Sequence, residues 1–477
     1  MTKSQTEKRY IVTFADTQTS ESTAAEILNI AANKIQDGVD LMATDAEIKP
    51  SDILHFNGLG STTLTLSEAE VKKYQADERI LAVEEDLEMH ILMDAAGEWS
   101  EEASLSAVHD FANEDISETV NLYYQQGYQH GQTALYQNLM SYNAYPGDIS
   151  RFFPPLAFTA QIPRVPMALM PGLPIKPAPF PLPPFEPLPV LTQPVPWNIA
   201  MVNAPKAWAR GYRGTGVKVA VLDTGIASHP DLVISGGASF VPGVASYHDG
   251  HGHGTHCAGV IGAKNNLIGV VGVAPNSKVY AVKVLNDGGS GSTSWILAGM
   301  AWAKANGMHV VSMSLGSVSC QSLAYTNAIA QLNAAGVTVV CAAGNSGRPT
   351  SSFRCVNSPA NSPRAIAVAA IDANKVKADF SSFGTGCCPQ GANPVNISAP
   401  GVSVNSTYLS NGYKKMSGTS MACPHVAGAA ALVKQRFPAF TPAQIRARLL
   451  LTAADLGVPG NDQLYGAGLV DCNQATL

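Results

Sequence analysis

The stretch Val219-Ala220-Val221-Leu222-Asp223-Thr224-Gly225 is the most informative guide to the fold of this 477-residue chain. Its four apolar residues, followed by an acid and a glycine, are typical of a buried strand that ends in a turn. Similar apolar runs alternate with helical patterns along residues 192–477, at 217–222, 279–284, 308–313, 336–342 and 365–371. This alternation predicts an α/β fold, a parallel doubly wound sheet with helices on both faces.

Polar residues follow the strands at the end where parallel sheets gather functional groups. Asp223 ends the first run, and Asn345 ends another in an Ala-Gly-Asn sequence. His253 opens a His-Gly-Thr-His motif, and Ser420 lies in Gly-Thr-Ser-Met-Ala. An acid, an imidazole and a hydroxyl in the order Asp, His, Ser form one of the three known orders of the serine-protease triad. Each motif alone also fits a turn or a helix cap, so the prediction depends on their joint occurrence.

Peptide hydrolysis by a serine requires a base for the hydroxyl proton and a carboxylate that holds the base. We expect Ser420 to be the nucleophile, His253 the base and Asp223 the group that orients it. The amide of Asn345 and the start of the helix after Ser420 would stabilise the oxyanion. From the residues alone, His256 remains an alternative base, because five histidines occur in this region.

Residues 8–92 have the pattern of a separate, small α+β unit. Strands are predicted at 9–14, 53–56, 61–66 and 80–83, with a helix at 21–37. Ser67 and Glu70 form a capping-box sequence that starts a second helix. The order β-α-β-β-α-β is the ferredoxin-like arrangement.

Residues 93–191 differ from both flanking units. An acidic stretch and a possible helix at 114–142 precede a tract in which 15 of the 31 prolines lie between Pro154 and Pro196. Because proline cannot donate a backbone hydrogen bond, the tract favours extended polyproline II structure. We expect a semi-rigid linker, and a docking site for proline-binding domains is the alternative.

The net charge of −6 is unevenly distributed: −9 over residues 1–92, −7 over 93–191 and +10 over 192–477. Opposite charges favour attraction within the chain. The positive charges are scattered, which argues against a nucleic-acid partner. The sequence has no apolar run of 18 residues, so no membrane span is expected. Its first residues lack the apolar core of a secretory signal, which leaves a cytosolic location, another export route and a removed leader as alternatives.

The motifs around Asp223, His253, Asn345 and Ser420 resemble those of the subtilisin-like serine proteases, or subtilases, over residues 192–477. The resemblance implies a monomeric serine endopeptidase with broad, apolar-leaning specificity, in which His253 is the base and His256 is structural. It also places a peptide substrate between two edge strands, which include Ser314, Leu315, Gly316 and Gly289, Ser290, Gly291. Thr293 stands where many relatives have tyrosine, which implies a more open S4 pocket, the site of the fourth residue (P4) before the cut bond.

The same resemblance implies a structural calcium ion. Its ligands would be oxygen atoms, as a hard cation requires, from Gln193, Asp231, Lys264, Asn266, Ile268 and Val270. Lys264 would contribute only its carbonyl, and its charge would weaken binding. An asparagine-rich surface turn is the alternative reading of this loop.

All eight cysteines lie between residues 257 and 472. Cys257 resembles the free cysteine beneath the catalytic histidine of the proteinase K and thermitase branches, and Cys423 is also expected to be reduced. The best disulfide prediction is Cys320 with Cys355, whereas Cys387 and Cys388 are not assigned. The sequence contains no Cys-x-x-Cys pair, so no structural zinc site is expected.

Residues 8–92 resemble the propeptide-inhibitor domain of many subtilases, which implies a folding chaperone and a product-like inhibitor. Its tail, Met89 to Leu92, would lie in the cleft, with Leu92 in the S1 pocket (for P1, the residue before the cut bond) and Met89 in S4. We therefore expect self-cleavage after Leu92. A second cut near residue 191 would release the linker; otherwise the linker stays attached. A dedicated precursor-processing protease and a non-catalytic scaffold are the competing functions.

Overall fold

A computed structural model describes residues 8–44, 48–93, 193–384, 387–388 and 393–477. All of these residues belong to one compact unit of the chain. The predicted helix at 114–142 and the proline tract up to residue 192 lie outside the described residues. Within the described residues, the helices lack the length and apolar character that are needed to cross a membrane.

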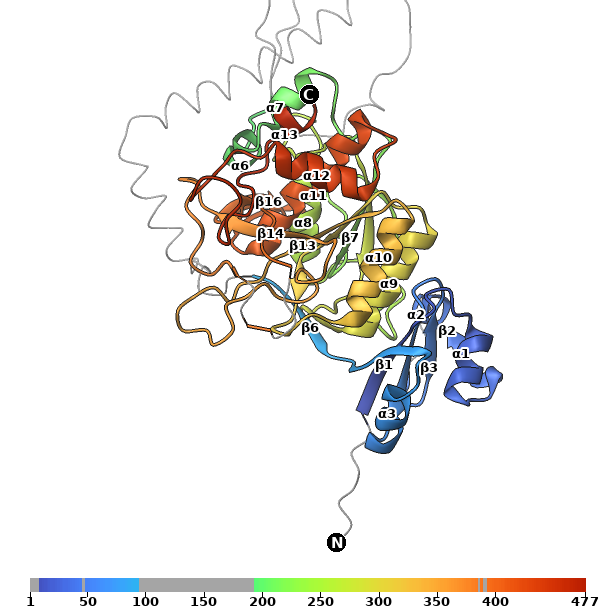
Figure 1. The fold of residues 1–477 in the computed structure, drawn as a ribbon. Helices are drawn as coiled ribbons and strands as arrows, with labels where there is room; N and C mark the ends of the chain where they lie inside the picture. Colours follow the sequence, from blue (N-terminus) through green and yellow to red (C-terminus); the bar gives the residue numbers. More distant parts are fainter. Residues whose placement is uncertain (1–7, 45–47, 94–192, 385–386, 389–392) are drawn as a thin grey trace, which may run out of the picture. The chain divides into compact units, whose positions relative to one another are not determined.

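Seven parallel strands form the central sheet of residues 193–477, in the order β15-β14-β13-β11-β7-β9-β8 (Figure 1). This confirms the predicted parallel sheet. The strands are β7 (Lys218–Asp223), β8 (Ile234–Ser239), β9 (Lys278–Lys283), β11 (Val310–Met313), β13 (Thr338–Ala342), β14 (Ile366–Ile371) and β15 (Ile397–Pro400).

Side chains of β7 alternate between two apolar cores, as the two-residue period of a strand requires. Val219 and Val221 pack in the core that contains α8 (His253–Gly262) and α11 (Thr419–Arg436). Ala220 and Leu222 pack in the core of α9 (Thr293–Ala305) and α10 (Leu323–Ala334). Helices therefore cover both faces of the sheet. Other elements of this region include α6 (Trp197–Met201), α7 (Ala204–Ala209), β16 (Val404–Thr407), β17 (Tyr413–Met416), α12 (Pro442–Leu451) and α13 (Cys472–Ala475).

The N-terminal unit has the sheet order β2-β3-β4-β1-β5, and β3-β4-β1-β5 is the expected ferredoxin-like core. The capping box of Ser67 and Glu70 is present at the start of α3. The predicted helix at 21–37 is too long, because Asn29 adopts the left-handed conformation (φ 55°) that ends a helix. The elements are β1 (Lys8–Phe14), α1 (Glu21–Leu28), β2 (Ile35–Asp37), α2 (Gly38–Met42), β3 (Ile53–Phe56), β4 (Ser61–Leu66), α3 (Glu68–Gln75) and β5 (Ile80–Glu85).

A short strand, β6 (Glu88–Ile91), follows this unit and lies between two strands of residues 193–477. It pairs antiparallel with β10 (Ser290–Ser292) and with β12 (Leu315–Gly316). The C-terminal tail of the small unit is thus a middle strand of a three-stranded sheet.

The disulfides differ from the predicted pair of Cys320 with Cys355, which is wrong. Cys320 is bonded to Cys388 and Cys355 to Cys387. Two adjacent cysteines cannot easily bond to each other, but here each reaches a different segment, and the distance along the chain gave no sign of this. Four cysteines are free and buried, including Cys257 and Cys423 as expected.

Two leucines of α12 offer a matched test of the core. Leu449 is fully buried, whereas Leu451 is 85 % exposed. Because Leu449→Ala leaves a cavity, we expect it to lower the free energy of unfolding by about 2–5 kcal/mol. The control Leu451→Ala should change it by no more than about 0.5 kcal/mol. Urea unfolding of both variants, in a Ser420→Ala background that prevents self-digestion, measures the difference, and equal losses would contradict this packing.

Candidate active site

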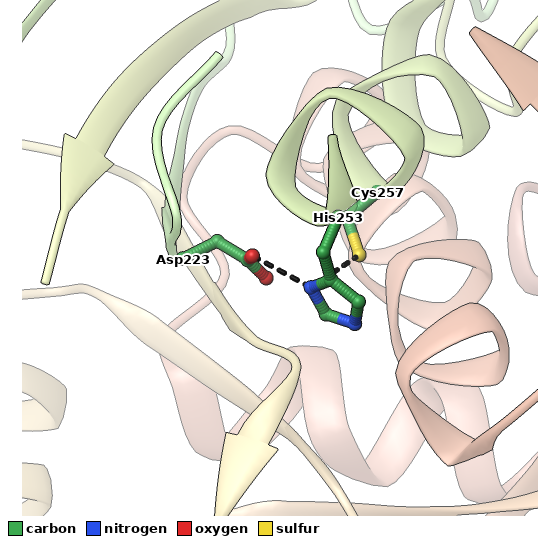
Figure 2. A group of neighbouring side chains, drawn as sticks. All are labelled: Asp223, His253 and Cys257. Carbon is green, nitrogen blue, oxygen red and sulfur yellow. Dashed lines mark hydrogen bonds and ion pairs between the residues drawn. The ribbon is translucent and has the colours of Figure 1, made fainter. Parts of the chain in front are cut away.

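The carboxylate of Asp223 and the imidazole of His253 form a buried pair. Asp223 is the last residue of β7 and His253 the first of α8. The His253 Nδ1 and Asp223 Oδ1 atoms are 2.6 Å apart, and neither side chain is exposed (Figure 2). Gly254 permits this approach, because a Cβ atom there would collide with the carbonyl oxygen of Gly225. The pair can hold one imidazole tautomer, with Nδ1 protonated and Nε2 available.

Ser420 is the second residue of α11. Its hydroxyl donates to the carbonyl oxygen of Ser314 at 2.8 Å and accepts from the N–H of Leu92 at 3.2 Å. Nε2 of His253 has no hydrogen-bond partner among the described residues. The arrangement therefore joins Asp223 to His253 but leaves the serine hydroxyl turned toward Ser314.

The carbonyl oxygen of Leu92 accepts from one donor, and a second donor group lies near it. The N–H of Ser420 donates to it at 3.4 Å. Asn345 Oδ1 accepts from the N–H and the hydroxyl of Thr419, at 3.0 and 2.8 Å. These two bonds fix the orientation of the amide, so its Nδ2 group points away from Thr419. This Nδ2 is buried without a partner among the described residues. A Cβ atom placed on Gly418 would meet both the Leu92 oxygen and Asn345 Nδ2, so the two lie around one point. Such a pair of donors can stabilise an oxyanion.

The six residues predicted to bind substrate lie on both sides of β6. Ile91 donates its N–H to the carbonyl of Gly289 at 3.0 Å, and Leu92 donates to Ser314 at 3.4 Å. His90 is opposite Ser290, and Met89 is opposite Gly291. Ile91 is opposite Leu315, and His90 faces Gly316 on the second edge. The hydroxyl of Thr293 donates to the carbonyl of Leu87 at 3.2 Å.

Two further groups near His253 stay uncharged. Burial raises the pKa of the Cys257 thiol well above its usual value, and its sulfur is 4.0 Å from His253 Nδ1. Asp223, His253 and Cys257 lie close enough to resemble a metal site (Figure 2), but a metal requires the thiolate. Burial also lowers the pKa of His256 to about 3. Its Nε2 is 2.9 Å from the carbonyl of Val404, which favours a structural role.

Sequence reasoning missed Asp249, a buried carboxylate that shapes the loop before α8. It accepts from the hydroxyls of Thr224 and Thr255, at 2.8 and 2.6 Å, and from the N–H groups of His251 and Gly252. It therefore holds the end of β7 against the start of α8. Its signal in the sequence was weak, since an acid four residues before His253 also fits an ordinary turn.

Two acids of the N-terminal unit were also missed. Glu84 accepts from the N–H groups of Leu323 and Ala324, at 3.1 and 2.8 Å, at the start of α10. Asp86 accepts from the N–H and the hydroxyl of Ser294, at 2.9 and 2.6 Å, at the start of α9. Both carboxylates occupy the positive end of a helix.

The predicted calcium ligands lie together in one loop region. Gln193 Nε2 donates to the carbonyls of Ile268 and Val270, both at 2.7 Å. Asn266 Oδ1 accepts from the N–H of Ile268 at 3.2 Å. One oxygen of Asp231, Oδ1, is buried and lacks a partner among the described residues. Lys264 points its ammonium at the carbonyl of Pro275, 2.9 Å away. Gln193 Oε1 accepts from the N–H groups of Asn266 and Leu267, at 2.8 and 3.1 Å, so the amide nitrogen faces the two carbonyls. The carbonyls and the unpartnered carboxylate oxygen of Asp231 are oxygen atoms of the kind that a hard cation binds.

Comparisons with known proteins identify the family of the chain. The family model described as "Subtilase family" matches residues 214–468. The chain is 53 % identical over 286 residues, or 60 % of its length, to a thermostable alkaline protease of Halalkalibacterium halodurans, of which it covers 74 %. It is 53 % identical over 284 residues to Subtilisin Savinase of Lederbergia lenta, covering 60 % of the chain and 99 % of that protein. For Subtilisin DY of Bacillus licheniformis the identity is 48 %, over 59 % of the chain and 99 % of that protein.

The amide of Asn345 offers a direct test of the oxyanion site. Replacing it with alanine removes the unpartnered Nδ2 donor, so we expect kcat on a peptide substrate to fall roughly 10²–10³-fold, the range established for the corresponding amide of subtilisin itself. KM should change little, because the donor acts on charge that develops in the transition state. Asn306→Ala, which removes an amide at the end of α9, is the control. Steady-state kinetics measures both, and an equal kcat for the two variants would refute the assignment.

Proposed function

Since the chain belongs to the subtilase family and is a serine endopeptidase, we propose that it is made as a zymogen that cuts itself after Leu92. One observation carries the proposal: the carbonyl oxygen of Leu92 accepts from the N–H of Ser420 while β6 lies between two edge strands. A peptide carbonyl in this place belongs either to the bond that the site would cut or to the new C-terminus that remains after the cut. We further propose that the enzyme acts as a monomer, because one chain supplies every residue of the site.

The reaction follows from the positions of three side chains. The Ser420 hydroxyl turns from Ser314 to Nε2 of His253, which takes its proton. The oxygen then attacks the carbonyl carbon before the cut bond, and the N–H of Ser420 with the Asn345 amide stabilises the oxyanion. Asp223 stabilises the imidazolium, which gives its proton to the departing amine. Water, activated by the same imidazole, releases the acyl group and restores the serine.

Residues 8–92 would act as an inhibitor through contacts outside the cleft as well. Glu84 and Asp86 accept hydrogen bonds at the N-termini of α10 and α9, and a carboxylate at such a helix end contributes about 0.3–1 kcal/mol. Lys304 donates to the carbonyl of Gly58 at 2.6 Å, and Asn327 donates to that of Leu59 at 2.5 Å. The charges of −9 and +10 on the two parts of the sequence add long-range attraction. These contacts explain how a cut product could stay bound.

Specificity would be broad and directed to apolar residues. β6 is held through its backbone, as in other cases of strand addition, so most sequences can bind. Apolar pockets then select two of the side chains: Leu92 is 8 % exposed and Met89 is fully buried. These residues correspond to P1 and P4 of a substrate.

We propose that the loop of Gln193, Asp231, Lys264, Asn266, Ile268 and Val270 binds one structural calcium ion. The unpartnered Oδ1 of Asp231 supports the site, because a buried carboxylate oxygen without a donor is costly. The ion would stabilise the loop and take no part in the chemistry.

Intact-mass measurement tests self-cleavage. Purified full chain should yield a fragment that ends at Leu92, whereas Ser420→Ala should stay whole. Leu92→Glu places a charge in an apolar pocket, so we expect its first cut to slow by about tenfold or more. Leu81→Glu, at a site that is 49 % exposed, is the matched control and should cut normally. An uncut wild-type chain, or a cut Ser420→Ala chain, would contradict self-processing.

Thermal unfolding of the Ser420→Ala chain tests the calcium site. At a concentration 100 times Kd, calcium should raise Tm by about 5–10 °C, because such binding adds about 2.7 kcal/mol. A chelator should reverse the shift, and Asp231→Asn should abolish most of it. Asp379→Asn, which alters an exposed ion pair with Arg348, is the control and should retain the shift. A shift that survives Asp231→Asn would place the ion elsewhere.

A further inference from the structure

Two disulfides meet at a pair of adjacent cysteines. Cys387 is bonded to Cys355 and Cys388 to Cys320, with Cα–Cα distances of 5.9 and 5.6 Å. Because Cys387 and Cys388 are neighbours in the chain, the two bonds connect the segments at 317–320 and 355–358 through a bridge of two residues. These segments are otherwise far apart in sequence.

The two connected segments meet beside the Leu92 side chain. Ser317 donates its N–H to the carbonyl of Ser358 at 2.9 Å, and Ser358 donates to Ser317 at 3.2 Å. A Cβ atom placed on Gly316 would lie 2.7 Å from the Ser358 oxygen and 3.1 Å from Cδ1 of Leu92. The end of the Leu92 side chain therefore meets Gly316 and Ser358, which belong to the two walls of its pocket.

Hydrogen bonds also join these walls, and the two disulfides add covalent links beside them. Residues 317–320 form neither a helix nor a strand beyond an isolated bridge. On the other wall, Asn357 donates its N–H to the carbonyl of Ala343 at 2.8 Å. Across the walls, Asn361 Nδ2 donates to the carbonyl of Ser319 at 2.9 Å. Each disulfide joins its wall only three or four residues from the point of contact with Leu92, which is close enough to limit the movement of that point.

We propose that the two disulfides position the walls of the P1 pocket and thereby set how tightly and how selectively the enzyme binds the P1 side chain. The four cysteines are positioning residues that act through Gly316 and Ser358. The proposal rests on the proposed function in one respect: Leu92 is taken to occupy the place of the P1 residue.

The disulfides are open to a chemical test because they differ from the other cysteines in exposure. Each disulfide has one exposed cysteine, Cys320 or Cys387; their partners are the half-buried Cys388 and the buried Cys355. The free thiols of Cys257, Cys341, Cys423 and Cys472 are all buried, and burial raises the pKa of each. Dithiothreitol acts only on the two disulfides, and a later alkylating reagent should modify the thiols released there before the four buried thiols. Each bond takes up two electrons and two protons, and the reductant closes to its cyclic disulfide.

The test compares peptide substrates that differ only in having Leu, Phe or Ala at P1. For Cys320→Ser with Cys388→Ser, and for Cys355→Ser with Cys387→Ser, we expect KM for the Leu peptide to rise about tenfold, the effect of a poorly fitted apolar pocket. The preference for Leu over Ala should fall by a similar factor, while kcat should stay within about threefold. Cys472→Ser, at a buried free cysteine far along the chain, is the control and should lower stability without changing the P1 preference.

If either double variant fails to fold or process, the wild-type enzyme is folded first, reduced with dithiothreitol and alkylated with iodoacetamide. The same loss of P1 preference is expected. An unchanged ratio of Leu, Phe and Ala peptides, with only a lower unfolding temperature, would show that the disulfides merely stabilise the fold and would overturn the proposal. Failure of the proposed active site is distinguished by Ser420→Ala, which would then retain activity with both disulfides intact.

Discussion

The interaction on which the rest of the account depends is the pairing of β6 with two edge strands at once. A strand that is bonded on both sides has fixed register, so the position of each side chain follows from the backbone. His90 opposite Ser290 and Ile91 opposite Leu315 place the next residue, Leu92, at the start of α11. The chemistry of the site and the selectivity of its pockets both follow from this placement.

The central sheet supplies the other half of the arrangement. Because all seven strands are parallel, their carboxyl ends share one edge, and β7 brings Asp223 there beside the first residue of α8. Close approach requires glycine at two places where a side chain would collide, Gly254 beneath the pair and Gly418 beside the Leu92 carbonyl. The buried acid Asp249 accepts from Thr224, after β7, and from Thr255, in α8, and so holds these two elements together.

The sequence predicted the features that depend on neighbouring residues, such as strands and a helix start, and few that depend on contacts between distant segments. The parallel strands followed from apolar runs, and α3 followed from its capping box. The helix at 21–37 was too long because no residue other than Asn29 marked its end. The disulfide pairs and the caps that Glu84 and Asp86 provide could not be found, because each joins segments that only the folded chain brings together. Asp223, His253 and Ser420 could be predicted because chemistry restricts the residue types of such a site, and the structure brings Asp223 and His253 into contact. Supporting residues such as Asp249 are not restricted in this way.

An engineered cross-link between β6 and β10 tests whether β6 lies between the two edge strands. His90→Cys and Ser290→Cys, made together in the Ser420→Ala chain, place two thiols at directly opposed positions of an antiparallel pair. Because His90 is opposite Ser290, we expect this disulfide to form on mild oxidation, seen as the loss of two alkylatable thiols. His90→Cys with Ser292→Cys, displaced by two residues, should stay reduced. Equal cross-linking of the two pairs, or none in either, would contradict the placement of the tail in the cleft.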